Sequence, residues 1–194
     1  MRECDNLIKK EDWLTIPNIL SYIRILMIPL YIYLYVTADE QMEYYWAAGV
    51  LVLSALTDSL DGIIARKTGQ ITDLGKVIDP LADKLTQVAV IGAMFLERPY
   101  ILPLLILFVV KELFLLVNNL VLYRKDIKMD GSMWFGKVAT AVFYFCMFLL
   151  VIFPTLDKSG SMPLIIMTAV FQMIALIGYG KWFMNMFKNI FKKR

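Results

Sequence analysis

The chain has 194 residues, of which 59% are hydrophobic, and a mean hydropathy of +0.64, values that exclude an ordinary soluble domain and predict an integral membrane protein. Its net charge of +3 is modest, and we expect no nucleic-acid partner. The absence of histidine excludes histidine bases, histidine metal ligands and Ser-His-Asp triads, and the two cysteines, Cys4 and Cys146, indicate neither a disulfide nor a Cys-rich metal site.

Hydropathy predicts an all-α fold with six transmembrane helices in one domain, residues 1–194, because a helix needs about 20 apolar residues to cross a bilayer. The juxtamembrane segment 1–15 has the pattern of a short amphipathic helix or of a disordered end, and we expect no cleavable signal peptide. Residues 184–194 are predicted to form a basic tail. The expected spans are Ile16–Val36, Tyr44–Arg66, Lys76–Leu96, Ile101–Tyr123, Trp134–Phe153 and Leu164–Phe183.

The basic residues outside these spans alternate between two sides of the membrane. The N-terminal segment, the loops after the second and fourth spans and the tail are rich in Lys and Arg, whereas the loops at 38–43, 97–99 and 156–163 are poorer in them. The positive-inside rule therefore predicts that both termini are cytoplasmic. It also predicts that residues 58–83 lie at the cytoplasmic ends of the second and third spans.

Four aspartates stand in these two otherwise apolar spans: Asp58 and Asp61, then Asp79 and Asp83. Helical spacing places each pair on one face of its helix, and the short loop between the helices allows all four carboxylates to meet. Acids inside a membrane cost roughly 2.5–3.5 kcal/mol each, and like charges repel. Structural ion pairs with nearby bases would offset part of this cost. One or two divalent cations would relieve the repulsion itself, and Mg²⁺ or Mn²⁺ suits oxygen ligands.

The residues around the acids are typical of a site that a ligand approaches closely. Gly62 and Gly75, with the small Ala65, allow such an approach, although glycines in helix pairs also serve packing alone. The guanidinium of Arg66 would bind a phosphate through two hydrogen bonds. Thr72, in the linking loop, would add a hydroxyl contact.

The pattern Asp58-x2-Asp61-Gly62-x2-Ala65-Arg66-x8-Gly75-x3-Asp79-x3-Asp83 resembles the full signature of the CDP-alcohol phosphotransferase family. The resemblance implies that family's fold: an integral membrane enzyme, usually a homodimer. It also implies transfer of a phosphatidyl group from CDP-diacylglycerol to an alcohol, with release of CMP. The sequence resembles bacterial members of the family, which implies a multi-pass protein of the cell membrane with a cytoplasmic active site.

The resemblance also assigns roles to the residues of the signature. Asp58, Asp61 and Asp79 would hold two divalent cations, with Asp83 as a shared ligand or as the general base. A carboxylate base agrees with the lack of histidine, and phosphoryl transfer needs mainly positioning and charge neutralisation. The CDP moiety would be bound by the set Gly62, Ala65, Arg66, Thr72 and Gly75.

The acceptor alcohol depends on other residues. The run at 15–29, which contains Asn18 and Arg24, resembles the first span of phosphatidylglycerophosphate synthases and of cardiolipin synthases. Lys111 and Lys137 are further candidates for binding the acceptor. Glycerol 3-phosphate is the first prediction, although Ala139 replaces a lysine that its synthases often carry.

Two alternatives remain open. The run at 137–141 matches cardiolipin synthases rather better, and their acceptor is phosphatidylglycerol. A transporter would also use intramembrane acids, but the paired repeats and broken helices typical of transporters are not seen in the sequence.

Overall fold

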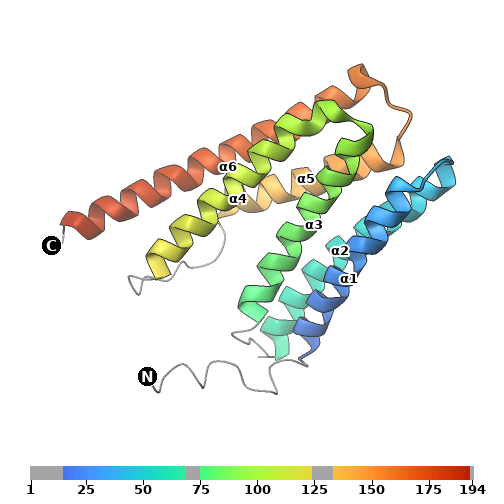
Figure 1. The fold of residues 1–194 in the computed structure, drawn as a ribbon. Helices are drawn as coiled ribbons and strands as arrows, with labels where there is room; N and C mark the ends of the chain where they lie inside the picture. The colour runs from blue at the N-terminus through green and yellow to red at the C-terminus, as the bar shows by residue number, and fades with distance from the viewer. Residues whose placement is uncertain (1–14, 69–74, 124–132, 193–194) are drawn as a thin grey trace. The chain divides into compact units, whose positions relative to one another are not determined.

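A computed structural model describes residues 15–68, 75–123 and 133–192 (Figure 1). The N-terminal segment, Thr72 and the last two residues lie outside these ranges. Within them the chain is helical, with a 3-10 turn before the fourth helix and no strand. The elements are α1 (Ile16–Val36), α2 (Gln41–Thr68), α3 (Gly75–Glu97), η2 (Pro99–Ile101), α4 (Leu102–Tyr123), α5 (Trp134–Ile152) and α6 (Lys158–Lys192).

The predicted all-α fold is confirmed, and the limits of α1 agree with the expected span at both ends. The largest difference is α6, which begins six residues before the expected Leu164 and continues to Lys192, through most of the predicted tail. Hydropathy detects only the apolar middle of this helix, because its ends are polar. Four described helices are long and apolar enough to span a membrane, namely α1, the η2–α4 segment, α5 and α6. The aspartates and basic residues of the signature lie in α2 and α3, which do not meet that criterion.

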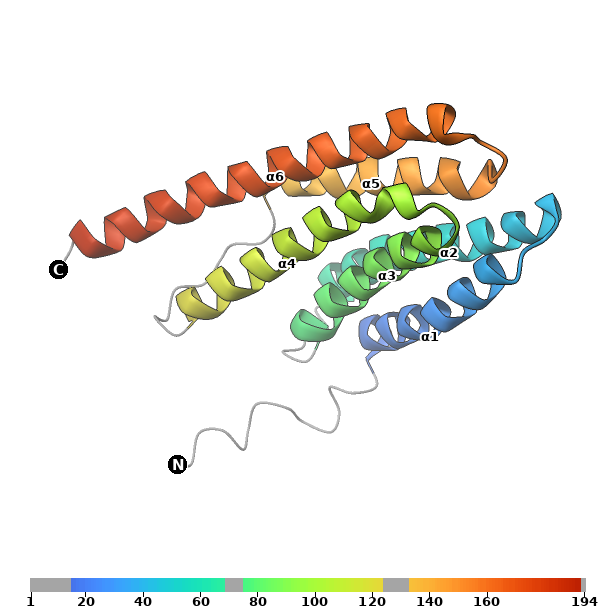
Figure 2. The same cartoon turned by 45° about the horizontal axis from the view of Figure 1, so that its top comes forward.

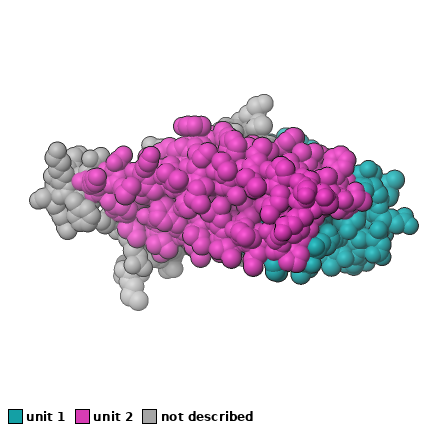
Figure 3. All heavy atoms as spheres, turned by 90° about the horizontal axis from the view of Figure 1, so that it is seen from above, with its two compact units in different colours: residues 1–97 teal, residues 98–194 magenta. Residues whose placement is uncertain are grey.

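The chain divides into two compact units, Met1–Glu97 and Arg98–Arg194, which Figure 3 colours separately. In the first unit, α1 packs against both α2 and α3 (Figures 1 and 2). Pro17 occupies the first turn of α1, where its missing N–H leaves no helical hydrogen bond unmade. The helix α1 therefore contacts both helices that carry the aspartates.

A tyrosine–carboxylate contact joins the same three helices far from the aspartates. The hydroxyl of Tyr35, on α1, donates to Glu97 Oε2 at 2.8 Å, and the hydroxyl of Tyr44, on α2, donates to Oε1 at 3.1 Å. Tyr35 is fully buried. Because Glu97 is the last residue of α3, this contact fixes the ends of all three helices.

The second unit is built around α6, which packs against α4 and α5. Two glycines allow α5 and α6 to approach closely: a Cβ at Gly136 would meet the Tyr179 hydroxyl, and a Cβ at Gly178 would lie 2.9 Å from the Phe135 ring. The guanidinium of Arg98 donates to three carbonyls at the C-terminal end of α5, the nearest at 2.8 Å. This buried arginine thereby satisfies carbonyls that have no partner within the helix.

Candidate active site

The candidate site lies at the end of the first unit where α2 finishes and α3 begins. Asp58 stands in the second half of α2, while Asp79 and Asp83 stand one turn apart near the start of α3. The i, i+4 spacing places the latter two on one face of α3, as the sequence predicts. Asp61, Gly62, Ala65 and Arg66 also lie on α2, but their side chains are outside the described part of the structure.

The face that α1 turns toward these acids is polar and buried. Asn18, Ser21 and Arg24 follow one another at intervals of three residues, and each is at most 1% exposed. Such a buried polar stripe is expensive in a membrane helix unless its groups find partners. The acids of α2 and α3 supply partners for two of its members.

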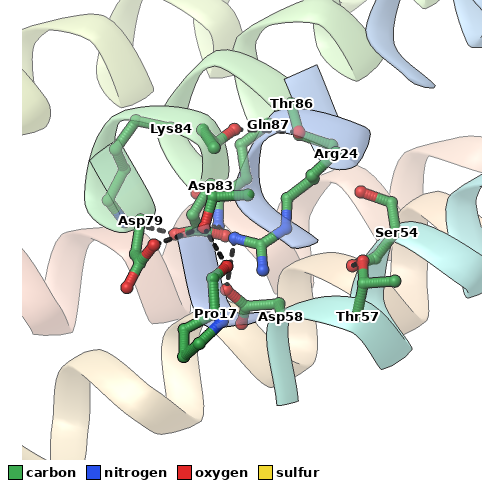
Figure 4. A network of polar contacts seen from close by, with 12 residues as sticks. Pro17, Arg24, Ser54, Thr57, Asp58, Asp79, Asp83, Lys84, Thr86 and Gln87 are labelled. Carbon is green, nitrogen blue, oxygen red and sulfur yellow. Dashed lines mark hydrogen bonds and ion pairs between the residues drawn. The ribbon is translucent and has the colours of Figure 1, made fainter. Parts of the chain in front are cut away.

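Arg24 forms an ion pair with Asp58 across α1 and α2, with Nη1 2.7 Å from Oδ1 (Figure 4). The arginine side chain is completely buried, whereas that of Asp58 is 39% exposed. The ion pair therefore joins a completely buried guanidinium to a carboxylate that remains partly exposed.

Ser21 performs the corresponding role for α3. Its hydroxyl is hydrogen-bonded to Asp79 Oδ1 and lies 3.1 Å from the carbonyl oxygen of Pro17, one turn earlier on α1. The single hydroxyl proton is shared between these two acceptors. Both α1 contacts use the Oδ1 atom of their aspartate.

Two residues of its own helix contact Asp83. The side-chain amide nitrogen of Gln87, one turn later, lies 3.0 Å from Oδ1 and 3.2 Å from Oδ2. Lys84 Nζ lies 3.2 Å from Oδ2, and its side chain is 33% exposed. These two contacts of Asp83 thus come from a buried neutral donor and a partly exposed cation.

The three described carboxylates come together near one point. Asp58 interacts electrostatically with both Asp79 and Asp83, and also with Arg24 and Lys84 (Figure 4). No three Cys, Asp or Glu side chains of the described ranges already form a ready cation cage, and the fourth acid of the signature, Asp61, lies outside those side chains.

The four candidate acceptor residues divide between the two units. Asn18 and Arg24 lie on α1 beside the acids. Lys111 lies in α4 of the second unit and is buried: its Nζ is 2.6 Å from Gln172 Oε1 on α6, 2.7 Å from Glu112 Oε1 and 4.8 Å from the centre of the Phe108 ring. Lys137 is exposed in the first turn of α5.

Two residues of the site, Ser21 and Gln87, are absent from the set that the sequence predicts as ligands. The signal for Gln87 is present in the sequence, since it follows Asp83 by four residues and so lies on the same face of the helix. Ser21 stands within the run that resembles family members, but only the packing of α1 against α3 reveals that it contacts Asp79.

Comparison with known proteins shows which family the chain resembles over most of its length. A family model described as CDP-alcohol phosphatidyltransferase matches residues 14–179. Over 187 residues the chain is 30% identical to an Aquifex aeolicus protein named CDP-diacylglycerol--glycerol-3-phosphate 3-phosphatidyltransferase, a match that covers 93% of this chain and 100% of the relative.

A second relative, from Streptomyces coelicolor, is named cardiolipin synthase (CMP-forming). It is 35% identical over 129 residues, which make up 66% of this chain and 60% of that relative. A Pseudomonas fluorescens protein with the same name as the Aquifex relative is 40% identical over 72 residues, which cover 37% of this chain and 36% of that protein. The chain thus matches the whole length of one relative and smaller parts of the others.

Proposed function

Because the chain belongs to the CDP-alcohol phosphatidyltransferase family, we propose that it transfers a phosphatidyl group from CDP-diacylglycerol to glycerol 3-phosphate and releases CMP. The observation that carries this proposal is the convergence of Asp58 with Asp79 and Asp83, at the spacing of the family signature. The end-to-end match with the Aquifex relative supports glycerol 3-phosphate as the acceptor.

The acids suit two divalent cations, Mg²⁺ or Mn²⁺. Asp58 and Asp79 use Oδ1 for their contacts with α1, so the Oδ2 atom of each is left for a metal. Asp61 and Asp83 would complete the ligand set. When bound, such cations supply charge neutralisation at the attacking and leaving oxygens of a phosphoryl transfer.

The side chains of this site divide the reaction between them. Asp83 would take the proton of the acceptor hydroxyl, whose oxygen bonds to the phosphorus of the phosphatidyl group. The bond from that phosphorus to the bridging diphosphate oxygen breaks, and the electron pair leaves with CMP. Arg66 and Thr72, with Gly62, Ala65 and Gly75 allowing close approach, would hold the CDP moiety.

Arg24 and Asn18, which lie beside the acids, are our candidates for binding the acceptor. Lys111 and Lys137 of the second unit are candidates on the resemblance alone. Lys137 is exposed and has no competing role in the described ranges that would prevent it from binding a phosphate. Lys111 already has Gln172 and Glu112 as partners, so its contribution would require those contacts to rearrange.

A second candidate function is cardiolipin synthesis, with phosphatidylglycerol as the acceptor. Two observations favour it: the match to the Streptomyces relative, and the presence of Ala139 where a lysine would suit the phosphate of glycerol 3-phosphate. Ala139 is 1% exposed.

One experiment separates these candidates. The purified protein, reconstituted with CDP-diacylglycerol and either Mg²⁺ or Mn²⁺, is offered glycerol 3-phosphate, phosphatidylglycerol, inositol phosphate or serine separately, and CMP release is measured. We expect release with glycerol 3-phosphate. Release with phosphatidylglycerol alone would establish the alternative, and no release with any acceptor under either metal would refute the transferase proposal.

The apolar helices identify a membrane protein, and we propose that its termini and active site face the cytoplasm and that it forms a homodimer. Native Cys4 allows a direct test of orientation, because Cys146 is completely buried. A membrane-impermeant maleimide should label Cys4 only in permeabilised cells. A Cys4→Ser, Thr155→Cys variant, with its thiol in the α5–α6 connection, should instead be labelled in intact cells. The mass of the protein in nanodiscs tests the dimer.

A further inference from the structure

Gln87 stands out among the buried polar residues of the first unit. It lies on α3 one turn after Asp83 and is completely buried. Its Nε2 contacts both oxygens of that carboxylate, at 3.0 and 3.2 Å, whereas its Oε1 has no hydrogen-bond partner in the described part of the structure. Given the proposed function, on which this inference rests, we propose that Gln87 is a positioning residue that holds Asp83 in its reactive orientation.

A purely structural role explains these contacts less well. A glutamine and an aspartate one turn apart do stabilise a helix by a small amount. However, a buried carbonyl oxygen without a partner destabilises the fold, because its hydrogen bonds to water are lost and no hydrogen bond within the protein replaces them. A leucine of similar volume would fill the same space without that loss. The polar group at position 87 is therefore better explained by what it does to Asp83 than by packing.

The geometry of the contact is suited to orientation. A donor that reaches both oxygens restricts rotation of the carboxylate about its χ2 angle, whereas a donor to one oxygen leaves that rotation freer. Lys84 approaches only Oδ2 and is partly exposed, so it gives no comparable restraint. The amide also carries no net charge, and it therefore does not act as a permanent counter-ion that competes with a metal or a proton for Asp83.

The test compares Gln87→Leu with a matched control, Thr86→Val. Thr86 is the neighbouring residue on α3, is also buried, and donates its hydroxyl hydrogen bond to the carbonyl oxygen of Ala82 at 2.9 Å. For each full-length protein in nanodiscs, three quantities are measured: the melting temperature, the affinity for Mn²⁺ by electron paramagnetic resonance, and kcat and KM for CMP release.

For Gln87→Leu we expect Mn²⁺ affinity and kcat each to fall about 10- to 100-fold, the range typical of groups that orient metal ligands. The KM for CDP-diacylglycerol should stay close to that of the wild type. The melting temperature should stay close to that of the wild type, because removal of the unpartnered oxygen offsets the loss of the hydrogen bonds to Asp83. Thr86→Val should retain the wild-type affinity and kcat.

Two results would overturn the inference. One is wild-type Mn²⁺ affinity and kcat in Gln87→Leu. The other is a loss of both that is accompanied by a lower melting temperature and shared by Thr86→Val, which would show a structural role. If the wild type binds Mn²⁺ but releases no CMP with any acceptor, the proposed function fails, while the Mn²⁺ affinities of the variants still decide the role of Gln87.

Discussion

Replacement of Arg24 by methionine tests whether α1 acts as the counter-ion of the acid cluster. Methionine is shorter than arginine but keeps the apolar stem of the side chain in the bundle, and it removes the charge that pairs with Asp58. The wild-type arginine is completely buried, so its guanidinium is not in contact with water.

The size of the effect follows from the geometry of the pair. At 2.7 Å and an effective dielectric constant of about 20, two unit charges attract by about 6 kcal/mol. The cost of removing the guanidinium from water offsets much of this gain. Asp58 is 39% exposed, so it remains partly solvated when the arginine is gone. We therefore expect Arg24→Met to destabilise the metal-free protein by about 2 kcal/mol, less than the roughly 3–5 kcal/mol for breaking a fully buried pair.

The assay is thermal unfolding in nanodiscs, with EDTA or with Mn²⁺, for Arg24→Met, Asp58→Asn and the double variant. In EDTA the double-mutant cycle should give a coupling of about 1–2 kcal/mol. Mn²⁺ supplies positive charge to Asp58, so it should reduce the destabilisation caused by Arg24→Met. Equal destabilisation with and without Mn²⁺, together with a coupling near zero, would refute the reasoning and show that the arginine acts by packing alone.

Three further changes test other parts of the structure. Asp83→Asn should abolish CMP release without a fall in melting temperature, and near-normal turnover would exclude the carboxylate as the base. Ser21→Ala should lower kcat about 10- to 100-fold through Asp79, whereas Ser21→Thr, which keeps the hydroxyl, should restore most of it; equal losses in both would contradict a hydrogen-bonding role. Gly178→Ala should destabilise the protein by about 1–3 kcal/mol in thermal unfolding, because its Cβ would lie 2.9 Å from an aromatic ring on α5. Gly49→Ala is the control, because a Cβ there would meet open space. Equal melting temperatures of the two variants would refute the close packing of α5 on α6.

The sequence predicts the helices well because the bilayer limits what the chain can do. An apolar stretch in a membrane must satisfy its backbone internally, so hydropathy alone gives α1 its correct ends and α5 its correct start. The prediction is less accurate for α6, where the helix continues beyond the apolar stretch at both ends. Hydropathy reports where lipid contacts the chain, whereas helical hydrogen bonding does not stop at the edge of the lipid.

The site is predictable where its residues share a helix and unpredictable where they do not. Spacing alone places Asp79 and Asp83 on one face of α3, and the signature brings Asp58 to them. The contacts of Ser21 and Arg24 depend on how α1 rotates and slides against α2 and α3. No periodicity within α1 contains that information, because its buried polar stripe would suit any polar neighbour.

The position of α1 explains how these acids are tolerated before any metal binds. Among the described side chains, two cations, Arg24 and Lys84, accompany the three carboxylates and offset part of their mutual repulsion. Such compensation lowers the cost of burying acids in a membrane helix pair. It also implies that Arg24 already neutralises part of the negative charge that would attract a divalent cation to the site. The same arginine that makes the metal-free fold possible should therefore weaken cation binding, and Arg24→Met should bind Mn²⁺ more tightly than the wild type, even though it is less stable.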